Sequence, residues 1–151
     1  VGFNHNASFL KKSIDGLTDE EWVRRPNDHS NHILWIVGHV AWARTMLLSR
    51  LNDPWTTPWL DLYARGRKCE DGADCPSPKL ATDAWNELCT RLHGALESAS
   101  EELLDTPVTQ GPPSADGKLS GIVNFLALHE TYHVGQIAYL RTWLGKPGPM
   151  G

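Results

Sequence analysis

Two histidines bracket a glutamate in the stretch HETYH, which runs from His129 to His133 and matches the pattern H-E-x-x-H. If this stretch is helical, residues four apart lie on one face, so the two imidazoles can bind the same metal ion. In many metallopeptidases the glutamate of this pattern is the general base. The pattern therefore raises the hypothesis of a zinc peptidase.

The sequence around HETYH does not fit that hypothesis. No His, Asp, Glu or Cys follows His133, whereas the third ligand of such enzymes usually comes from downstream. The longer pattern H-E-x-x-H-x-x-G-x-x-H also fails, because Gln136 and Tyr139 stand at its glycine and third-histidine positions. Glu130 projects about 100° from His129, toward the edge of the apolar stripe. We therefore predict that the chain is not a peptidase of this type.

His39 is the candidate for a third ligand, from a second apolar stretch. A helical projection places four apolar residues on its face: Trp35, Ile36, Ala43 and Met46. Burying unpaired imidazoles there costs on the order of a few kcal/mol, which a bound metal would remove. Three histidines from two helices leave at least one coordination position for water or substrate. We therefore predict a metal site of His39, His129 and His133, suited to chemistry or ligand binding rather than to a purely structural metal.

Two polar residues beside the histidine pair are candidates for catalytic roles. Gln136 projects near the ligands and could position a water or substrate, or it could be hydrogen-bonded within the core. Glu130 could orient a ligand imidazole, but we favour an ion pair with Arg141 near the helix surface. His32 is expected to cap a helix or to face solvent. The remaining histidines are expected on the surface: His5, His29 and His93.

Apolar residues recur at three- and four-residue steps along most of the chain, and no stretch shows the alternation typical of a strand. This periodicity predicts four long helices, at about residues 3–17, 31–51, 81–104 and 120–144. An antiparallel four-helix bundle is the simplest way to bury their apolar stripes together. The predicted fold class is therefore all-α.

Local signals define the helix ends and the links between helices. Ser30 is expected to cap the second helix, a capping box runs from Thr18 to Glu21, and Gly145 ends the fourth helix. The segment 52–80 is longer than a usual loop, so we predict a long crossover between the second and third helices. Three of its residues are expected to pack at the bundle mouth: Trp55, Trp59 and Leu62.

The composition fits one globular domain over residues 1–151, since 40% of the residues are apolar and 21% are charged. The net charge of -4 gives no basic footprint for nucleic acid, and no apolar run reaches the roughly 18 residues of a membrane span. The N-terminal stretch VGFNHNASFLKK lacks the apolar centre of a signal peptide. Three cysteines without metal-binding spacing favour free thiols and a cytoplasmic location. Cys69 and Cys75 are expected to flank a solvated loop, and Cys89 to pack within a helix.

Two stretches also carry a family resemblance. GHVAWAR, ending at Arg44, together with LHETYHVGQIAYLRTWLG, ending at Gly145, resembles the DinB/YfiT-like superfamily. The likeness covers essentially the whole chain, including EEWVRRP and the G-x-P closure after the last helix. It implies a four-helix bundle with a crossover after the second helix and a divalent metal bound by His39, His129 and His133. Zinc or nickel is the expected metal, with iron or manganese as alternatives.

The resemblance also implies a class of reaction. Characterised relatives include metal-dependent S-transferases and isomerases that use low-molecular-weight thiols such as bacillithiol or mycothiol. We therefore expect a metal-dependent transferase or hydrolase that acts on a small molecule with such a thiol as cosubstrate, and family likeness favours a homodimer. The alternative is a non-catalytic, stress-linked bundle that holds a metal or ligand. Arg44 stands where many relatives have a glutamate and Val134 where arginine is common, so the substrate is not carried over from them.

Overall fold

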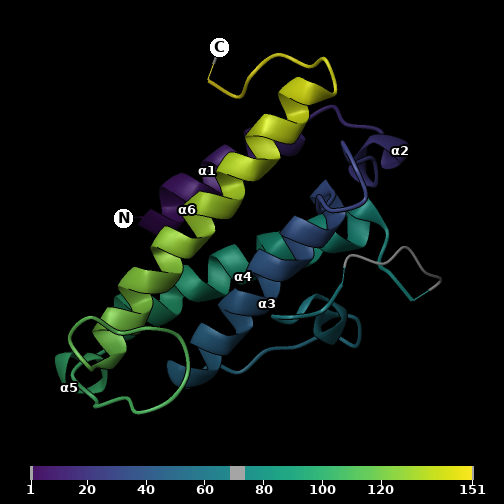
Figure 1. The fold of residues 1–151 in the computed structure, drawn as a ribbon. Coiled ribbons are helices and arrows are strands. Elements are labelled where there is room, and N and C mark those ends of the chain that lie inside the picture. Colours follow the sequence, from purple (N-terminus) through teal and green to yellow (C-terminus); the bar gives the residue numbers. More distant parts are fainter. Residues whose placement is uncertain (1, 69–73, 151) are drawn as a thin grey trace.

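Four long helices carry most of the chain in this computed structural model, which describes residues 2–68 and 74–150 (Figure 1). They are α1 (Gly2–Ile14), α3 (Ile33–Arg50), α4 (Pro78–Ser98) and α6 (Leu119–Trp143). Three short elements lie between them: α2 (Asp19–Trp22), the 3-10 helix η1 (Leu60–Tyr63) and α5 (Glu101–Leu104). No strand occurs within the two described ranges, and the all-α prediction is confirmed.

His32 decides where α3 begins. Its Nδ1 accepts a hydrogen bond from the backbone N–H of Trp35 at 3.0 Å, so His32 is the N-cap and the helix starts at Ile33. The predicted capping role of His32 is confirmed, whereas the prediction that Ser30 caps this helix is wrong. The Ser30 hydroxyl instead donates to Asn27 Oδ1 at 3.1 Å, within the preceding turn.

Two serines set the limits of the third helical segment. The Ser77 hydroxyl accepts a backbone N–H from the first turn, so α4 begins at Pro78, earlier than the predicted residue 81. Ser100 caps α5 in the same way, and the backbone at Ala99 and Ser100 is extended. The single helix predicted over about 81–104 is therefore two helices, because a second cap competes with helix continuation.

Glycines follow the ends of the first and last long helices, α1 and α6. α1 stops at Ile14, before the predicted residue 17, and Gly16 follows with φ of +68°. α6 ends at Trp143, and Gly145 has φ of +82°, as its predicted stop signal requires. The capping box from Thr18 is also present and opens α2. The glycine signals therefore predicted the end of α6 closely and the end of α1 less closely.

The direction of the helices follows from the long crossover. Asn6 donates to the Ala127 carbonyl at 3.0 Å and Arg141 donates to the Ser13 carbonyl at 3.2 Å, so α1 and α6 run in the same direction. α3 and α4 are also parallel, because the chain between them returns along the bundle (Figure 1). The predicted crossover is confirmed. The antiparallel order holds between α3 and α6 rather than between all neighbours.

The crossover packs against α3 at a glycine. Leu60 and Tyr63 of η1 are buried, and a Cβ added at Gly38 would overlap the Tyr63 ring. A residue without a side chain is therefore required for this close approach. The contact brings the backbone of η1 next to the middle of α3, where His39 lies.

The other predictions for this segment hold in part. Trp55 and Trp59 pack against the core as expected. Leu62 is exposed, because η1 turns Leu60 and Tyr63 inward instead. Cys89 is a free thiol on α4, as predicted, and Cys69 lies outside the described residues.

α3 is the most enclosed helix of the bundle. Thirteen of its 18 residues are buried, because it packs against α4, α6 and η1. His39 and Arg44 are among them, so each of these polar side chains must find its partners inside the protein. None of the described helices is long and apolar enough to cross a bilayer.

Candidate metal centre

The structure brings the three predicted ligands together. His39 on α3 faces His129 and His133 on α6, and one ring nitrogen from each lies within 4.8 Å of the others. The Nε2 atoms of His129 and His133 are 3.1 Å apart. The i, i+4 spacing on α6 and the antiparallel packing of α3 together produce this convergence.

Aromatic neighbours hold two of these rings. The His39 ring is stacked between Trp35 and Trp42, with centroid distances of 4.8 and 5.7 Å and interplanar angles of 14° and 19°. Phe125 stacks on His129 at 6.2 Å and 26°. Each stacking partner lies three or four residues away on the same helix, so the helices themselves fix the ring planes.

Hydrogen bonds define which nitrogen of His39 and His133 carries the proton. His39 Nδ1 lies 2.8 Å from the Tyr63 carbonyl oxygen, which can only accept, so Nδ1 carries the hydrogen. His133 Nδ1 lies 2.7 Å from Gln136 Oε1. The Gln136 amide donates its Nε2–H to the Tyr132 hydroxyl at 3.2 Å, which leaves Oε1 as the acceptor toward His133. Both histidines therefore present an unprotonated Nε2 to the cluster, the state a metal ligand needs.

His129 cannot satisfy both of its nitrogens with the protein alone. Its buried Nδ1 has no hydrogen-bond partner among the described residues, and its Nε2 faces the bare Nε2 of His133. If the proton is on Nδ1, the Nε2 lone pairs of His129 and His133 face each other. If the proton is on Nε2, no donor reaches the buried lone pair of Nδ1. Either arrangement costs about 1–3 kcal/mol for a buried polar group without a partner.

Burial keeps the imidazoles neutral. It lowers the pKa of His39, an effect that the bond to the Tyr63 carbonyl opposes. Burial also lowers the pKa of His129, and nearby positive charge on His39 and Arg65 acts in the same direction. For His133, burial and then the charge of His129 lower the pKa to about 4, against the hydrogen bond to Gln136. Three neutral imidazoles at physiological pH are Lewis bases ready for a cation.

The cluster therefore fits a divalent ion on its own chemistry. Two ring tautomers are fixed with Nε2 bare, and the third ring has a nitrogen that only an added partner can satisfy. Within the described residues the cluster comprises three histidines, and neither a carboxylate nor a thiolate joins them. Three-histidine sets of this kind leave room for a further ligand.

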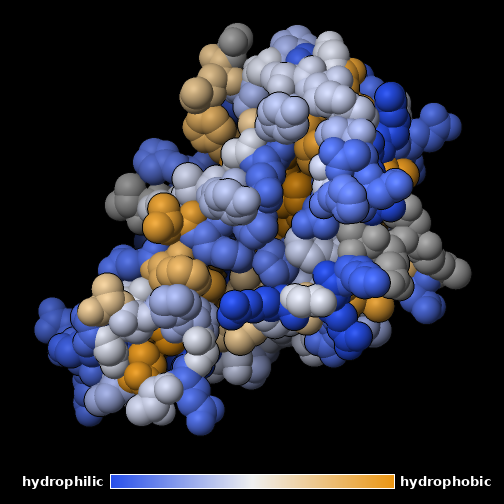
Figure 2. Space-filling model, in the orientation of Figure 1, coloured by the Kyte–Doolittle hydropathy of each residue, from blue (hydrophilic) through white to orange (hydrophobic). Residues whose placement is uncertain are grey.

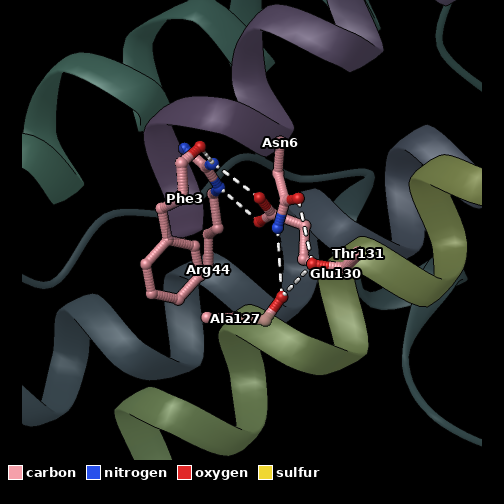
Figure 3. A network of polar contacts seen from close by, with 6 residues as sticks. All are labelled: Phe3, Asn6, Arg44, Ala127, Glu130 and Thr131. Carbon is pink, nitrogen blue, oxygen red and sulfur yellow. Dashed lines mark hydrogen bonds and ion pairs between the residues drawn. The ribbon is translucent and has the colours of Figure 1, made fainter. Parts of the chain in front are cut away.

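Glu130 does not point at this cluster, and its predicted partner is wrong. Its carboxylate receives two hydrogen bonds from Arg44, at 2.7 Å from Nε and 2.9 Å from the terminal nitrogen, and both side chains are at most 3% exposed (Figure 3). Arg141 instead donates to carbonyl oxygens of Ser13, Asp15 and Pro147. Eleven residues of helix separate Glu130 from Arg141, a rise of about 16 Å.

Further contacts surround this ion pair. Arg44 also donates to the Phe3 carbonyl at 3.3 Å, and its guanidinium lies over the Trp85 ring at 4.1 Å. Beside the carboxylate, the Thr131 hydroxyl donates to Asn6 Oδ1 at 3.0 Å (Figure 3). Burial raises the pKa of Glu130, while the bidentate hydrogen bonds and the charge of Arg44 oppose that rise. The pair thus joins α3, α6 and the start of α1.

Arg44 is the important polar residue that sequence reasoning missed. A signal was present: opposite charges stand within the two most apolar helices, five residues after His39 in one and directly after His129 in the other. Isolated charges in apolar helices are rarely buried without a partner. A search for the partner of Glu130 on another helix would have found it.

A cavity of about 520 Å³ opens at two of the three histidines. His39 and His129 form part of its wall, and Arg65 from the crossover lies on its lining. The rest of the lining is apolar and comes mainly from six residues: Trp42, Met46, Pro112, Pro113, Phe125 and Leu126. The histidine cluster is therefore accessible to a molecule of small-ligand size. Figure 2 shows a further hollow with hydrophobic residues, between the beginning of α3 and the C-terminal half of α6.

Comparisons with known proteins agree with this architecture. The family model described as the DinB superfamily matches residues 6–137. A crystal structure described as a conserved protein from Enterococcus faecalis is similar in fold, with a TM-score of 0.69 and 16% sequence identity over 93% of this chain and 91% of that one. At that identity the likeness concerns the fold alone. No curated protein sequence matches the chain.

Proposed function

The chain belongs to the DinB superfamily, and on that premise we propose that it is a divalent-metal-dependent transferase or hydrolase acting on a small molecule, with a low-molecular-weight thiol as cosubstrate. One observation carries the proposal: the cavity of about 520 Å³ meets the histidine cluster at His39 and His129. A metal held only to brace helices needs no such access. Zinc or nickel is the expected ion, because imidazole suits both.

His39, His129 and His133 would hold the ion. A bound divalent cation lowers the pKa of a thiol or water molecule and supplies the nucleophile at neutral pH. In the transferase reaction the thiol sulfur forms a bond to an electrophilic carbon, the bond to the leaving group breaks with its electron pair, and the thiol proton passes to solvent. In the hydrolase reaction water takes the place of the thiol.

The chain's own residues orient the ligands and hold the helices that carry them. The Tyr63 carbonyl and Gln136 Oε1 each accept a ring proton and so fix the nitrogen that faces the cluster. Gln136 is therefore proposed as a positioning residue that acts through His133. Glu130 is proposed to hold α3 against α6 through Arg44 rather than to act on substrate. A cytoplasmic location and a homodimer stay predictions from the sequence.

The proposal is tested in two stages on protein purified without a histidine tag. Elemental analysis measures bound zinc and nickel in wild type and in His39→Ala, with the exposed-histidine variant His5→Ala as control. Wild type and the control should retain about one ion per chain, and His39→Ala should lose it. Full retention by His39→Ala would contradict the three-ligand centre.

The second stage measures thioether formation between 1-chloro-2,4-dinitrobenzene and a panel of cysteine, coenzyme A, bacillithiol and mycothiol. Turnover that depends on added metal and disappears in His39→Ala supports the transferase. Release of product from activated esters in the absence of thiol supports the hydrolase. A protein that binds and is stabilised by metal but turns over neither kind of substrate would support the non-catalytic alternative.

A further inference from the structure

The cavity beside the histidines carries one permanent charge. Eleven residues line it, and Arg65 is the only Lys, Arg, Asp or Glu among them. A molecule in this cavity therefore meets apolar walls and a single guanidinium.

Arg65 is not committed to another part of the protein. Within the described residues no carboxylate or carbonyl oxygen accepts a hydrogen bond from its guanidinium, in contrast with Arg44, Arg50, Arg91 and Arg141, which all have such acceptors. An uncommitted arginine on a cavity wall offers a planar fork of donors that matches a carboxylate, sulfonate or phosphate.

The crossover holds this arginine at the cavity. Arg65 comes two residues after Tyr63, whose ring packs on Gly38 and whose carbonyl bonds His39. Arg65, His39 and His129 all line the same cavity. The anion-binding group and the metal ligands therefore belong to the same site.

We propose that this cavity binds an organic anion with an apolar, preferably aromatic, body: the anionic group pairs with Arg65, the body lies between Trp42 and Phe125, and the other end reaches His39 and His129. This proposal rests on the proposed function, because it names the substrate class of that site. The cavity volume of about 520 Å³ accommodates a molecule of this kind. Organic cations are excluded by the same charge.

Two matched probes test the charge preference by isothermal titration calorimetry: 2-naphthoate, an aromatic carboxylate, and 2-naphthamide, its neutral counterpart. Wild type should bind 2-naphthoate about fivefold more tightly, as expected for a partly solvated ion pair. Arg65→Gln should weaken 2-naphthoate about fivefold and leave 2-naphthamide unchanged. Arg67→Gln, which alters an exposed arginine outside the cavity lining, should bind both probes as wild type does.

A second variant tests the place of binding. Met46→Trp fills the apolar wall and should weaken both probes, with folding checked by circular dichroism and the urea midpoint. Binding of both probes at wild-type strength by a folded Met46→Trp variant would overturn the proposal. So would a preference for 2-naphthoate that survives Arg65→Gln.

Titrations with and without zinc separate this proposal from the metal hypothesis. If Arg65 binds the carboxylate, the preference for 2-naphthoate should persist in EDTA-treated protein. A preference that appears only with zinc would show that the metal holds the anion, which overturns the role of Arg65. Elemental analysis of Arg65→Gln should give the wild-type zinc content. Wild type that takes up no zinc when zinc is added, but retains the preference, would contradict the metal centre and leave the anion site standing.

Discussion

The interface between α3 and α6 holds two buried polar clusters, and they differ in how completely hydrogen bonds from the protein satisfy their polar atoms. Arg44 and Glu130 are joined by two hydrogen bonds, the Phe3 carbonyl accepts a further one from Arg44, and no buried atom of either side chain lacks a partner among the described residues. The three histidines carry no charge, yet His129 is left with a ring nitrogen that has no partner in the described chain. The cluster of Arg44 and Glu130 therefore needs no added ligand to satisfy its polar atoms, whereas the histidine cluster does.

Whether the protein itself satisfies the polar atoms of a cluster distinguishes a structural role from a functional one better than burial does. Glu130 is 2% exposed and His133 is 8% exposed, so both count as core residues. The histidine cluster borders the cavity of about 520 Å³, whereas Arg44 lies on the lining of a smaller one of about 290 Å³. Neighbours in one five-residue motif thus serve different clusters, because the 100° rotation per residue turns Glu130 toward Arg44 and the histidines toward His39.

The largest expected effect on stability comes from breaking the ion pair of Arg44 and Glu130. Arg44→Met leaves the Glu130 carboxylate buried without a counter-charge and should lower the free energy of unfolding by about 3–5 kcal/mol, measured by urea denaturation. The double variant Arg44→Met/Glu130→Met removes both charges and should be more stable than Arg44→Met alone. Arg91→Met, which breaks half-exposed ion pairs with Glu87 and Asp53, should cost less than about 1 kcal/mol. Equal losses for Arg44→Met and Arg91→Met would contradict the role assigned to the buried pair.

The second-largest expected effect is stabilisation by a zinc ion bound at the histidine cluster. Zinc at about 100 times its dissociation constant should raise the free energy of unfolding of wild type by about 2.7 kcal/mol, since the ion binds the folded state. His39→Ala should lose this stabilisation, while the double variant of the ion pair should keep it. Thermal melts with zinc and with EDTA provide the measurement. A zinc response in His39→Ala as large as in wild type would remove His39 from the centre.

A pH titration without metal distinguishes the clusters again. The pKa of His133 is lowered to about 4, below the roughly 6.5 of an unfolded chain, so the unfolded state binds the additional proton between these values. Stability should therefore fall as the pH drops from about 6.5 to 4, by roughly 2 kcal/mol for this residue. His133→Phe should flatten that part of the curve of unfolding free energy against pH, and His5→Phe should not. Parallel curves for wild type and His133→Phe would refute the assignment.

The smallest expected effect concerns the orientation of the His133 ring. Gln136→Leu removes the acceptor for the His133 ring proton but keeps all three ligands. Zinc affinity should fall about tenfold, equivalent to about 1.4 kcal/mol, as is typical when a hydrogen bond behind a metal ligand is lost. Competition with a chromophoric chelator measures this, and Gln136→Glu, which retains an acceptor oxygen, should recover most of the affinity. No recovery by glutamate would indicate that Gln136 acts by packing alone.

The histidine cluster was predictable from sequence because its signals are local. His129 and His133 share a helical face at i and i+4, and His39 stands in an apolar stretch where an imidazole needs a reason to be buried. Helix periodicity likewise predicted the four long helices, and the length of the segment after α3 predicted the crossover. These inferences depend only on distances along the chain.

The partners of those residues were not predictable, because they depend on which helices pack together. A helical projection gives the direction of Glu130 but not the helix that lies there, and so it suggested Arg141 in place of Arg44. Tyr63 acts through its carbonyl oxygen, which any residue possesses, and its position depends on the path of the crossover. The caps at His32 and Ser100 were decided by competition among nearby hydrogen-bond acceptors.

The acceptor for the His39 ring proton lies 24 residues away in sequence, on a crossover that reaches it only because residue 38 has no side chain. The other two histidines of the cluster lie on α6, near the other end of the printed sequence. During synthesis on the ribosome, the early helices therefore emerge with only one of the three imidazoles in place. Tight capture of an ion by all three would have to wait until α6 has docked, and metal uptake would then report that the bundle has finished assembling.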